Sequence, residues 1–148
     1  MLRVWNFSSL LFVGLALMPS GAHLLELPHK ISLPAPDYLV VQQLYRGWAL
    51  SGLVVLGELV STAFLTWELW QRQRPYGAAL LALVCVIGAQ ILFWSYTQPA
   101  NRATGNWMIL PGNWETLRQH WEYSHAASAI LGLIGFVALI WNVIRNAR

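Results

Sequence analysis

The stretch WETLRQHWEYSH, residues 114–125, lies directly ahead of the last long apolar run of the chain. A continuous helix through this stretch would place four chemically different side chains on one face, at positions i, i+3, i+4 and i+7. These are Arg118, Trp121, Glu122 and His125. A guanidinium, an indole, a carboxylate and an imidazole would then point the same way. We therefore expect this face to carry a functional site, which the rest of the chain holds in place.

The composition is that of a membrane protein. Of 148 residues, 57% are hydrophobic and 10% are charged, whereas soluble proteins are roughly 25% charged. The nine tryptophans also fit a bilayer, whose interfaces are enriched in Trp and Tyr. The net charge of +3 includes no basic cluster longer than the pair Arg72 and Arg74, so we expect no nucleic-acid partner. The single cysteine, Cys85, excludes an intramolecular disulfide.

Four apolar runs are long enough to span a hydrocarbon core of roughly 30 Å at about 1.5 Å per residue. They cover residues 4–25, 47–67, 76–94 and 126–143, and the intervening residues 96–112, with two prolines and two glycines, are predicted to be irregular. The first run could instead be a cleaved signal peptide, but a single preceding arginine is a short positive region, so we expect an uncleaved helix. The predicted fold is all-α, an integral membrane four-helix bundle in which residues 1–148 form a single domain.

Four spans place both termini on the same side of the membrane. Five arginines in the short segments flanking the spans then share that side, against four basic residues mixed with acidic ones on the other. The five are Arg3, Arg72, Arg74, Arg145 and Arg148. By the positive-inside rule we expect both termini in the cytoplasm, with the protein in a bacterial inner membrane.

On this topology, polar side chains gather at the outer end of the bundle, and all four histidines are among them. The set comprises His23, Glu26, His29, Arg46, Asn101, Arg118, His120, Glu122 and His125. Isolated charges at the edge of a bilayer would lack partners, so we predict that these groups line one cavity. We expect Arg118 to bind a carboxylate or an anionic ligand oxygen, with Glu122 or Glu26 as its partner within the chain.

Glu58 lies deeper, about 18 Å of helix rise from the outer end of its span. A carboxylate at that depth must be protonated or paired, and Gln90 of the third span is the neutral partner we expect. Glu58 is therefore either part of a proton relay or a neutral acid hydrogen-bonded between helices.

The sequence leaves two kinds of cofactor site as alternatives. A single metal ion could be held by His23, Glu26 and His125, because imidazole and carboxylate are common metal ligands. A haem could lie between His23 and His125 as axial ligands, as in other helical bundles. Ligand or cofactor binding is assigned to His23, Trp121 and Trp114, although no cofactor is required.

The residues Pro99-x-Asn101, followed by Trp114-x3-Arg118-x2-Trp121-x3-His125, resemble a motif of small four-helix membrane proteins. These small membrane proteins form the domain-of-unknown-function family that includes the anthrone oxygenases. The motif covers about 27 residues, and the number and spacing of the helices extend the likeness over the whole chain. In many members an arginine lies three residues after the histidine, and Ser128 occupies that position here.

The resemblance implies O2-dependent oxidation of an aromatic or quinone-type small molecule. That reaction needs a base for an acidic methylene proton and donors for the resulting enolate. We predict His125 as the base, Arg118 and Asn101 as the donors, and Trp114 and Trp121 as stacking surfaces for a flat ligand. The expected partners are a small aromatic or quinone-like ligand, the lipid bilayer and further copies of the chain in a homo-oligomer. The alternatives are a haem- or metal-binding redox module and a non-enzymatic structural or assembly subunit.

Overall fold

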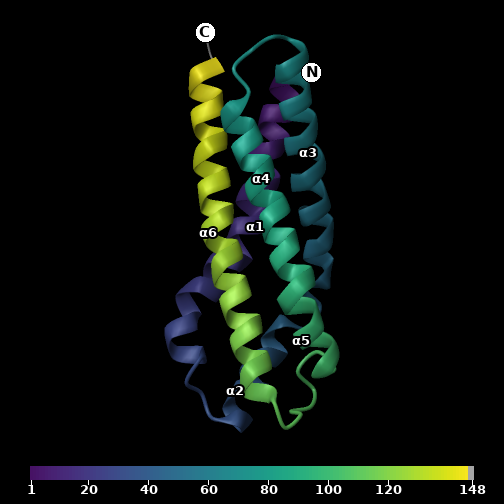
Figure 1. Ribbon diagram of the computed structural model, residues 1–148, viewed down its shortest axis with the longest axis vertical. Helices are drawn as coiled ribbons and strands as arrows, with labels where there is room; N and C mark the ends of the chain where they lie inside the picture. Colours follow the sequence, from purple (N-terminus) through teal and green to yellow (C-terminus); the bar gives the residue numbers. More distant parts are fainter. Residues whose placement is uncertain (147–148) are drawn as a thin grey trace.

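The computed structural model describes residues 1–146, apart from the side chain of Ala49, and is an all-α bundle (Figure 1). Its long helices are α1 (Leu2–Lys30), α3 (Ser51–Gln71), α4 (Gly77–Leu92) and α6 (Trp114–Asn146). The chain of α4 continues through a π-helical segment, η3 (Phe93–Thr97), into α5 (Gln98–Ala103), and the three form one span. Four segments are thus long and apolar enough to cross a membrane. The predicted four-helix membrane bundle is confirmed.

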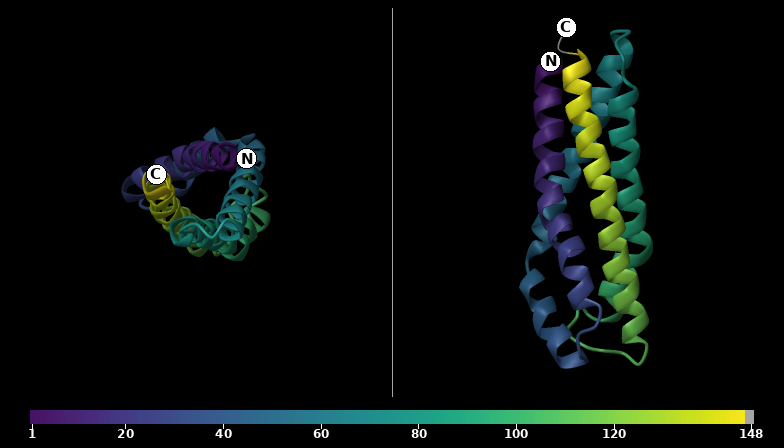
Figure 2. Two further views of the ribbon diagram at one scale, coloured as in Figure 1. Left: turned by 90° about the horizontal axis from the view of Figure 1, so that it is seen from above. Right: turned by 90° about the vertical axis from the view of Figure 1, so that its left-hand side faces the viewer.

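Both termini lie at one end of the bundle, and the short helices lie at the other (Figures 1 and 2). These short elements are α2 (Ala35–Gln42) and the 3-10 turns η1 (Gln43–Tyr45) and η2 (Trp48–Leu50). We call the end with α2 and α5 the α2 end. The predicted placement of both termini on the same side is confirmed, and their cytoplasmic location stays a prediction. Arg148, one of the five arginines behind it, lies outside the described residues.

The end of the first helix lies where it was expected, and one segment expected to be irregular is helical. The helix continues past its apolar run to Lys30, through Pro19 and Pro28, within the stretch 23–30 where its end was expected. Each proline removes one backbone hydrogen bond, but burial of His23 and Lys30 holds the last turns in place. Residues 98–103 were expected to be irregular but form α5, because Pro99 occupies its first turn, where the missing N–H is tolerated.

The link from α5 to α6 has an unusual backbone. Three consecutive residues are left-handed, with φ of 56° at Gly105, 56° at Asn106 and 61° at Trp107. Only glycine adopts this conformation without a steric cost. The indole of Trp107 is nevertheless buried, and its backbone N–H donates to Thr104 Oγ1 at 3.0 Å. Burial of the ring therefore holds the strained backbone.

Two apolar clusters make up the interior. Toward the termini, eight buried side chains of the four long helices pack together. They are Val13, Leu65, Leu69, Ala79, Ala82, Val86, Ala138 and Leu139. A Cβ added at Gly135 of α6 would lie 3.4 Å from Cys85 Cβ and 3.6 Å from Ala82 Cα, so small residues allow α4 and α6 to approach closely. The second cluster lies at the α2 end and comprises Tyr38, Ala100, Trp107 and Trp121.

Gly57 of α3 lies against Phe12 of α1. A Cβ added at Gly57 would be 2.5 Å from the nearest ring carbon of Phe12. We expect Gly57→Ala to displace this ring and to lower the free energy of unfolding by about 1–3 kcal/mol. The matched control is Gly21→Ala in α1, because no atom lies within 4 Å of a Cβ added there. Equal unfolding midpoints for the two variants in detergent would contradict this account of the α1–α3 contact.

Candidate functional site

The imidazoles of His23 in α1 and His125 in α6 lie against each other inside the α2 end. Their ring centroids are 4.4 Å apart. The indole of Trp121 lies 4.9 Å from His23 and 4.2 Å from His125, and the phenol of Tyr45 lies 4.6 Å from His23, edge to face. We call His23, Tyr45, Trp121 and His125 the imidazole cluster. It brings together residues from α1, η1 and α6.

Helical spacing explains the α6 side of this cluster. Because α6 continues unbroken from Trp114, Trp121 and His125 lie one turn apart on the same face, as predicted. The same face carries Glu122, which is fully buried. The predicted face of α6 is therefore turned toward α1. Its imidazole, that of His125, contacts His23, the buried histidine of α1.

A buried ammonium group lies beside the cluster. Lys30 is 3% exposed, and its Nζ lies 3.1 Å from Glu122 Oε1 and 3.5 Å from Glu26 Oε2. It donates a hydrogen bond to Tyr45 Oη at 2.9 Å. It also lies over the rings of Tyr45 and Trp121, at 4.5 and 4.7 Å from their centroids. Lys30 therefore links the carboxylates to the aromatic part of the site.

Sequence reasoning did not identify Lys30 as a site residue. The signal was its spacing, since His23, Glu26 and Lys30 lie at i, i+3 and i+7 and share one face of a helix. We expected the helix to end within residues 23–30 and to be interrupted at Pro28, so this face was not recognised.

Glu122 is held by donors from two elements. Tyr38 of α2 donates to Glu122 Oε1 at 2.9 Å, and Gln42 Nε2 donates to Tyr38 Oη at 2.6 Å. Glu122 Oε2 is buried and has no hydrogen-bond partner in the described part of the chain. The carboxylate therefore has one satisfied oxygen and one oxygen open to a further donor.

The two phenols at this end act as hydrogen-bond donors. Burial, and then the nearby Glu122 carboxylate, raises the pKa of Tyr38 above its ordinary value. Burial, and then its hydrogen bond to Glu26, raises the pKa of Tyr45 in the same way. Both side chains therefore remain protonated at neutral pH, and each donates to a carboxylate.

Asn101 borders the imidazole cluster. Its Oδ1 accepts a hydrogen bond from Trp121 Nε1 at 2.9 Å, which fixes the orientation of the indole. The predicted donor residue is thus brought to the site, but as a partner of a tryptophan.

Arg118 lies farther away than predicted. Its Nη1 donates to the Leu33 carbonyl at 2.7 Å, and the guanidinium lies 4.6 Å from the Trp114 ring centroid. About 10 Å of helix rise separates it from His125. The predicted ion pair of Arg118 with Glu122 or Glu26 is wrong, because Lys30 lies next to both carboxylates. Arg118 and Trp114 instead tie α6 to the segment after α1.

The other predicted polar groups do not join the cluster. His29 is exposed, and His120 is exposed with its ring 5.6 Å from that of Tyr96. Arg46 is exposed and contacts Met108 Sδ at 3.1 Å. The four histidines thus divide into an interior pair, with His23 buried and His125 partly exposed, and two surface residues.

The positions of His23 and His125 bear on both the metal site and the haem site predicted from the sequence. Among residues 1–146, no three His, Cys, Asp or Glu side chains are arranged to hold a metal ion, and the set His23, Glu26 and His125 stays a prediction. A haem would need its axial imidazoles on opposite faces of the macrocycle. The rings of His23 and His125 touch each other at 4.4 Å, so this arrangement does not fit a haem between them.

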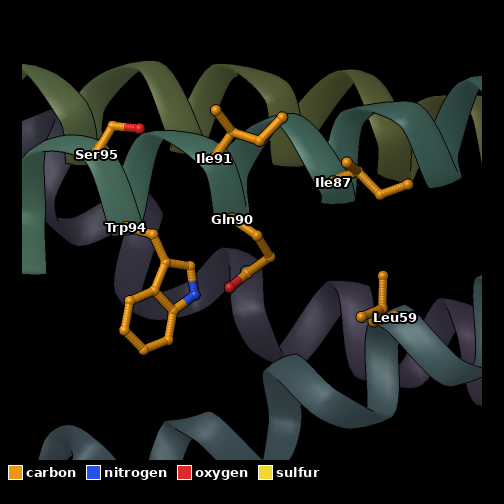
Figure 3. Close-up of a pocket in the computed structure, with 6 residues that line it drawn as sticks. All are labelled: Leu59, Ile87, Gln90, Ile91, Trp94 and Ser95. Carbon is orange, nitrogen blue, oxygen red and sulfur yellow. The ribbon is translucent and has the colours of Figure 1, made fainter.

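Glu58 and Gln90 do not meet as expected. Glu58 is buried on α3, and its carboxyl group has no hydrogen-bond partner in the part of the chain that the structure describes. Gln90 instead faces a shallow groove of about 380 Å³ between α3 and α4 (Figure 3). The groove is lined by Leu59, Ile87, Gln90, Ile91, Trp94 and Ser95. The predicted hydrogen bond between Glu58 and Gln90 is wrong.

Comparison with known proteins gave no match: no family model, no curated protein and no solved structure is significantly similar to this chain. The resemblance to the anthrone oxygenase family therefore rests on the motif residues in α5 and α6.

Removing the Lys30 ammonium should be strongly destabilising. Lys30→Met would leave Glu122 buried without its cation, and we expect a loss of about 3–5 kcal/mol in the free energy of unfolding. The double variant Lys30→Met/Glu122→Gln, which removes both charges, should recover most of this loss. Denaturant unfolding in detergent measures all three proteins. If the double variant is as unstable as Lys30→Met, the Lys30–Glu122 interaction is not the cause.

The raised pKa of Tyr38 predicts a dependence of stability on alkaline pH. Its contribution is fully present below pH 10, the ordinary pKa of tyrosine, and is lost as pH rises above it, because only the unfolded chain ionises readily there. We expect the unfolding midpoint of the parent to fall more steeply above pH 10 than that of Tyr38→Phe. Parallel slopes would show that Tyr38 ionises equally in both states.

Proposed function

We propose that the imidazole cluster is the acid–base site of a membrane oxidoreductase that oxidises an aromatic small molecule with O2, as anthrone oxygenases do. The observation that carries this proposal is the contact between the buried imidazole of His23 and the partly exposed imidazole of His125, beside the indole of Trp121. Imidazole is the side chain most often used to abstract a proton near neutral pH. An indole face suits a flat aromatic ligand.

The chemistry needs no external reductant. An anthrone has a methylene group between two aromatic rings, and transfer of one methylene proton to His125 leaves an enolate. The enolate gives one electron to O2, and the resulting radical and superoxide combine to form a peroxide anion. This anion takes the proton back from the His125 imidazolium and becomes a hydroperoxide. Loss of water from the hydroperoxide creates a carbonyl, so CH2 and O2 become C=O and H2O. The protein needs to supply a base, donors for the enolate oxygen and a pocket that excludes bulk water.

The donor nearest to the cluster is Lys30. Its ammonium lies over the Trp121 ring, where a stacked ligand would bring its oxygen. Tyr45 accepts a hydrogen bond from this ammonium and donates its own proton to Glu26, so it positions Lys30. We therefore assign enolate stabilisation to Lys30 in place of Arg118. Asn101 keeps a supporting role, since it orients Trp121.

Ligand entry would require the aromatic rings to separate. Trp48 packs against the imidazole cluster from the surface side. It is 40% exposed, and its ring lies 5.8 Å from that of His23 and 5.0 Å from that of Tyr45. It follows Gly47, whose φ of 84° is readily adopted only by glycine. Movement of Trp48 about Gly47 would open a path to His23.

The central test is His125→Ala. It should abolish oxidation of an anthrone by the purified protein while leaving helical content and yield near those of the parent. His120→Ala is the matched control, because this histidine is exposed on the same helix and should tolerate the change. Product formation and O2 consumption measure the effect. Full activity of folded His125→Ala would remove the base from the proposal, and a parent without activity would favour a structural or assembly subunit.

A further inference from the structure

The geometry points to Glu26 as the residue through which the buried His23 imidazole exchanges protons with water. This inference rests on the proposed function, because it gives the acid–base site a connection to solvent through which its protonation state is reset. It concerns a residue of α1 and can be tested without any substrate.

The charged and titratable groups of this network differ in exposure. The side chains of Lys30, His23 and Glu122 are 4%, 5% and 0% exposed, whereas that of Glu26 is 41% exposed. Of these four, Glu26 is the group that reaches solvent. Glu122 carries the same chemical group but is enclosed, so it cannot release a proton directly to water.

Contacts place the Glu26 carboxylate at the junction of the network. Its Oε2 lies 3.8 Å from His23 Nδ1 and 3.5 Å from Lys30 Nζ, and it accepts a hydrogen bond from Tyr45 Oη. His23 Nδ1 is buried and has no hydrogen-bond partner among residues 1–146. The ring nitrogen nearest to Glu26 is therefore free to share a proton with it. Rotation of the half-exposed Glu26 side chain would shorten 3.8 Å to hydrogen-bond distance.

The transfer is balanced at each step. A protonated imidazole loses the proton on His23 Nδ1, and the Glu26 carboxylate gains it as a carboxylic acid. Glu26 then releases the proton to water and returns to the carboxylate. Lys30 and Tyr45 fix the same oxygen in place, while Glu122 and His125 are the titratable groups that face the network from α6.

Glu26→Gln tests this route, because glutamine keeps the size and an oxygen acceptor for Tyr45 but cannot carry the proton. The protein is reconstituted in lipid nanodiscs with isotope-labelled histidine, and exchange of the imidazole N–H protons with water is measured by NMR without substrate. We expect exchange at His23 to slow by about tenfold or more in Glu26→Gln. Added formate should restore exchange in Glu26→Ala, where the shortened side chain leaves room for it, and Glu26→Asp should exchange as the parent does. Glu115→Gln, which alters an exposed glutamate at the start of α6, is the matched control.

Unchanged exchange in folded Glu26→Gln would overturn the inference, as would slower exchange in Glu26→Ala that formate does not restore. If Glu26→Gln fails to fold, Glu26→Ala with and without formate gives the same two outcomes. Anthrone oxidation is measured in parallel. A parent that lacks activity but shows Glu26-dependent exchange would refute the proposed reaction and retain the proton route. An active parent with Glu26-independent exchange would do the reverse.

Discussion

The ion pair between Lys30 and Glu122 is the interaction on which the α2 end of the bundle depends. Removing two charges from water costs several kcal/mol for each ion, and mutual attraction compensates only when other polar atoms are also satisfied. Tyr45 accepts a hydrogen bond from the Lys30 ammonium, and Tyr38 donates one to the Glu122 carboxylate. Because these phenols come from α2 and η1, the pair joins α1 and α6 and also orders the short elements outside the bundle. The positions of both imidazoles follow from this arrangement.

The two ends of the molecule solve different packing problems. Toward the termini, alanine and glycine let α4 and α6 approach closely, and aliphatic side chains fill the remaining space. At the α2 end, large aromatic rings and charged groups replace them. The uniform apolar part serves as a rigid support, on which the chemically varied part can be positioned. This division is typical of proteins whose sites lie on elements that cover the end of a scaffold.

Hydropathy was sufficient to predict the spans, because a bilayer requires long apolar helices and four runs met that length. The face formed by Trp121, Glu122 and His125 was also predictable, since the period of one uninterrupted helix determines it. Lys30 was missed because a proline two residues earlier suggested that the helix had ended. The partner of Arg118 is a backbone carbonyl, for which residue identities give no signal. Glu58 and Gln90 were wrongly paired because hydropathy does not determine how neighbouring helices are rotated about their axes.

The left-handed turn at residues 105–107 places strained backbone in the segment that covers the α2 end. Non-glycine residues in this conformation store roughly 1–2 kcal/mol each, and at Trp107 burial of the indole against Tyr38 opposes that strain. If the indole left its buried position, the backbone could relax. The strain energy released would offset part of the free energy lost with the contact between Trp107 and Tyr38. The backbone conformation of the link between α5 and α6 therefore depends on the burial of a single side chain, that of Trp107.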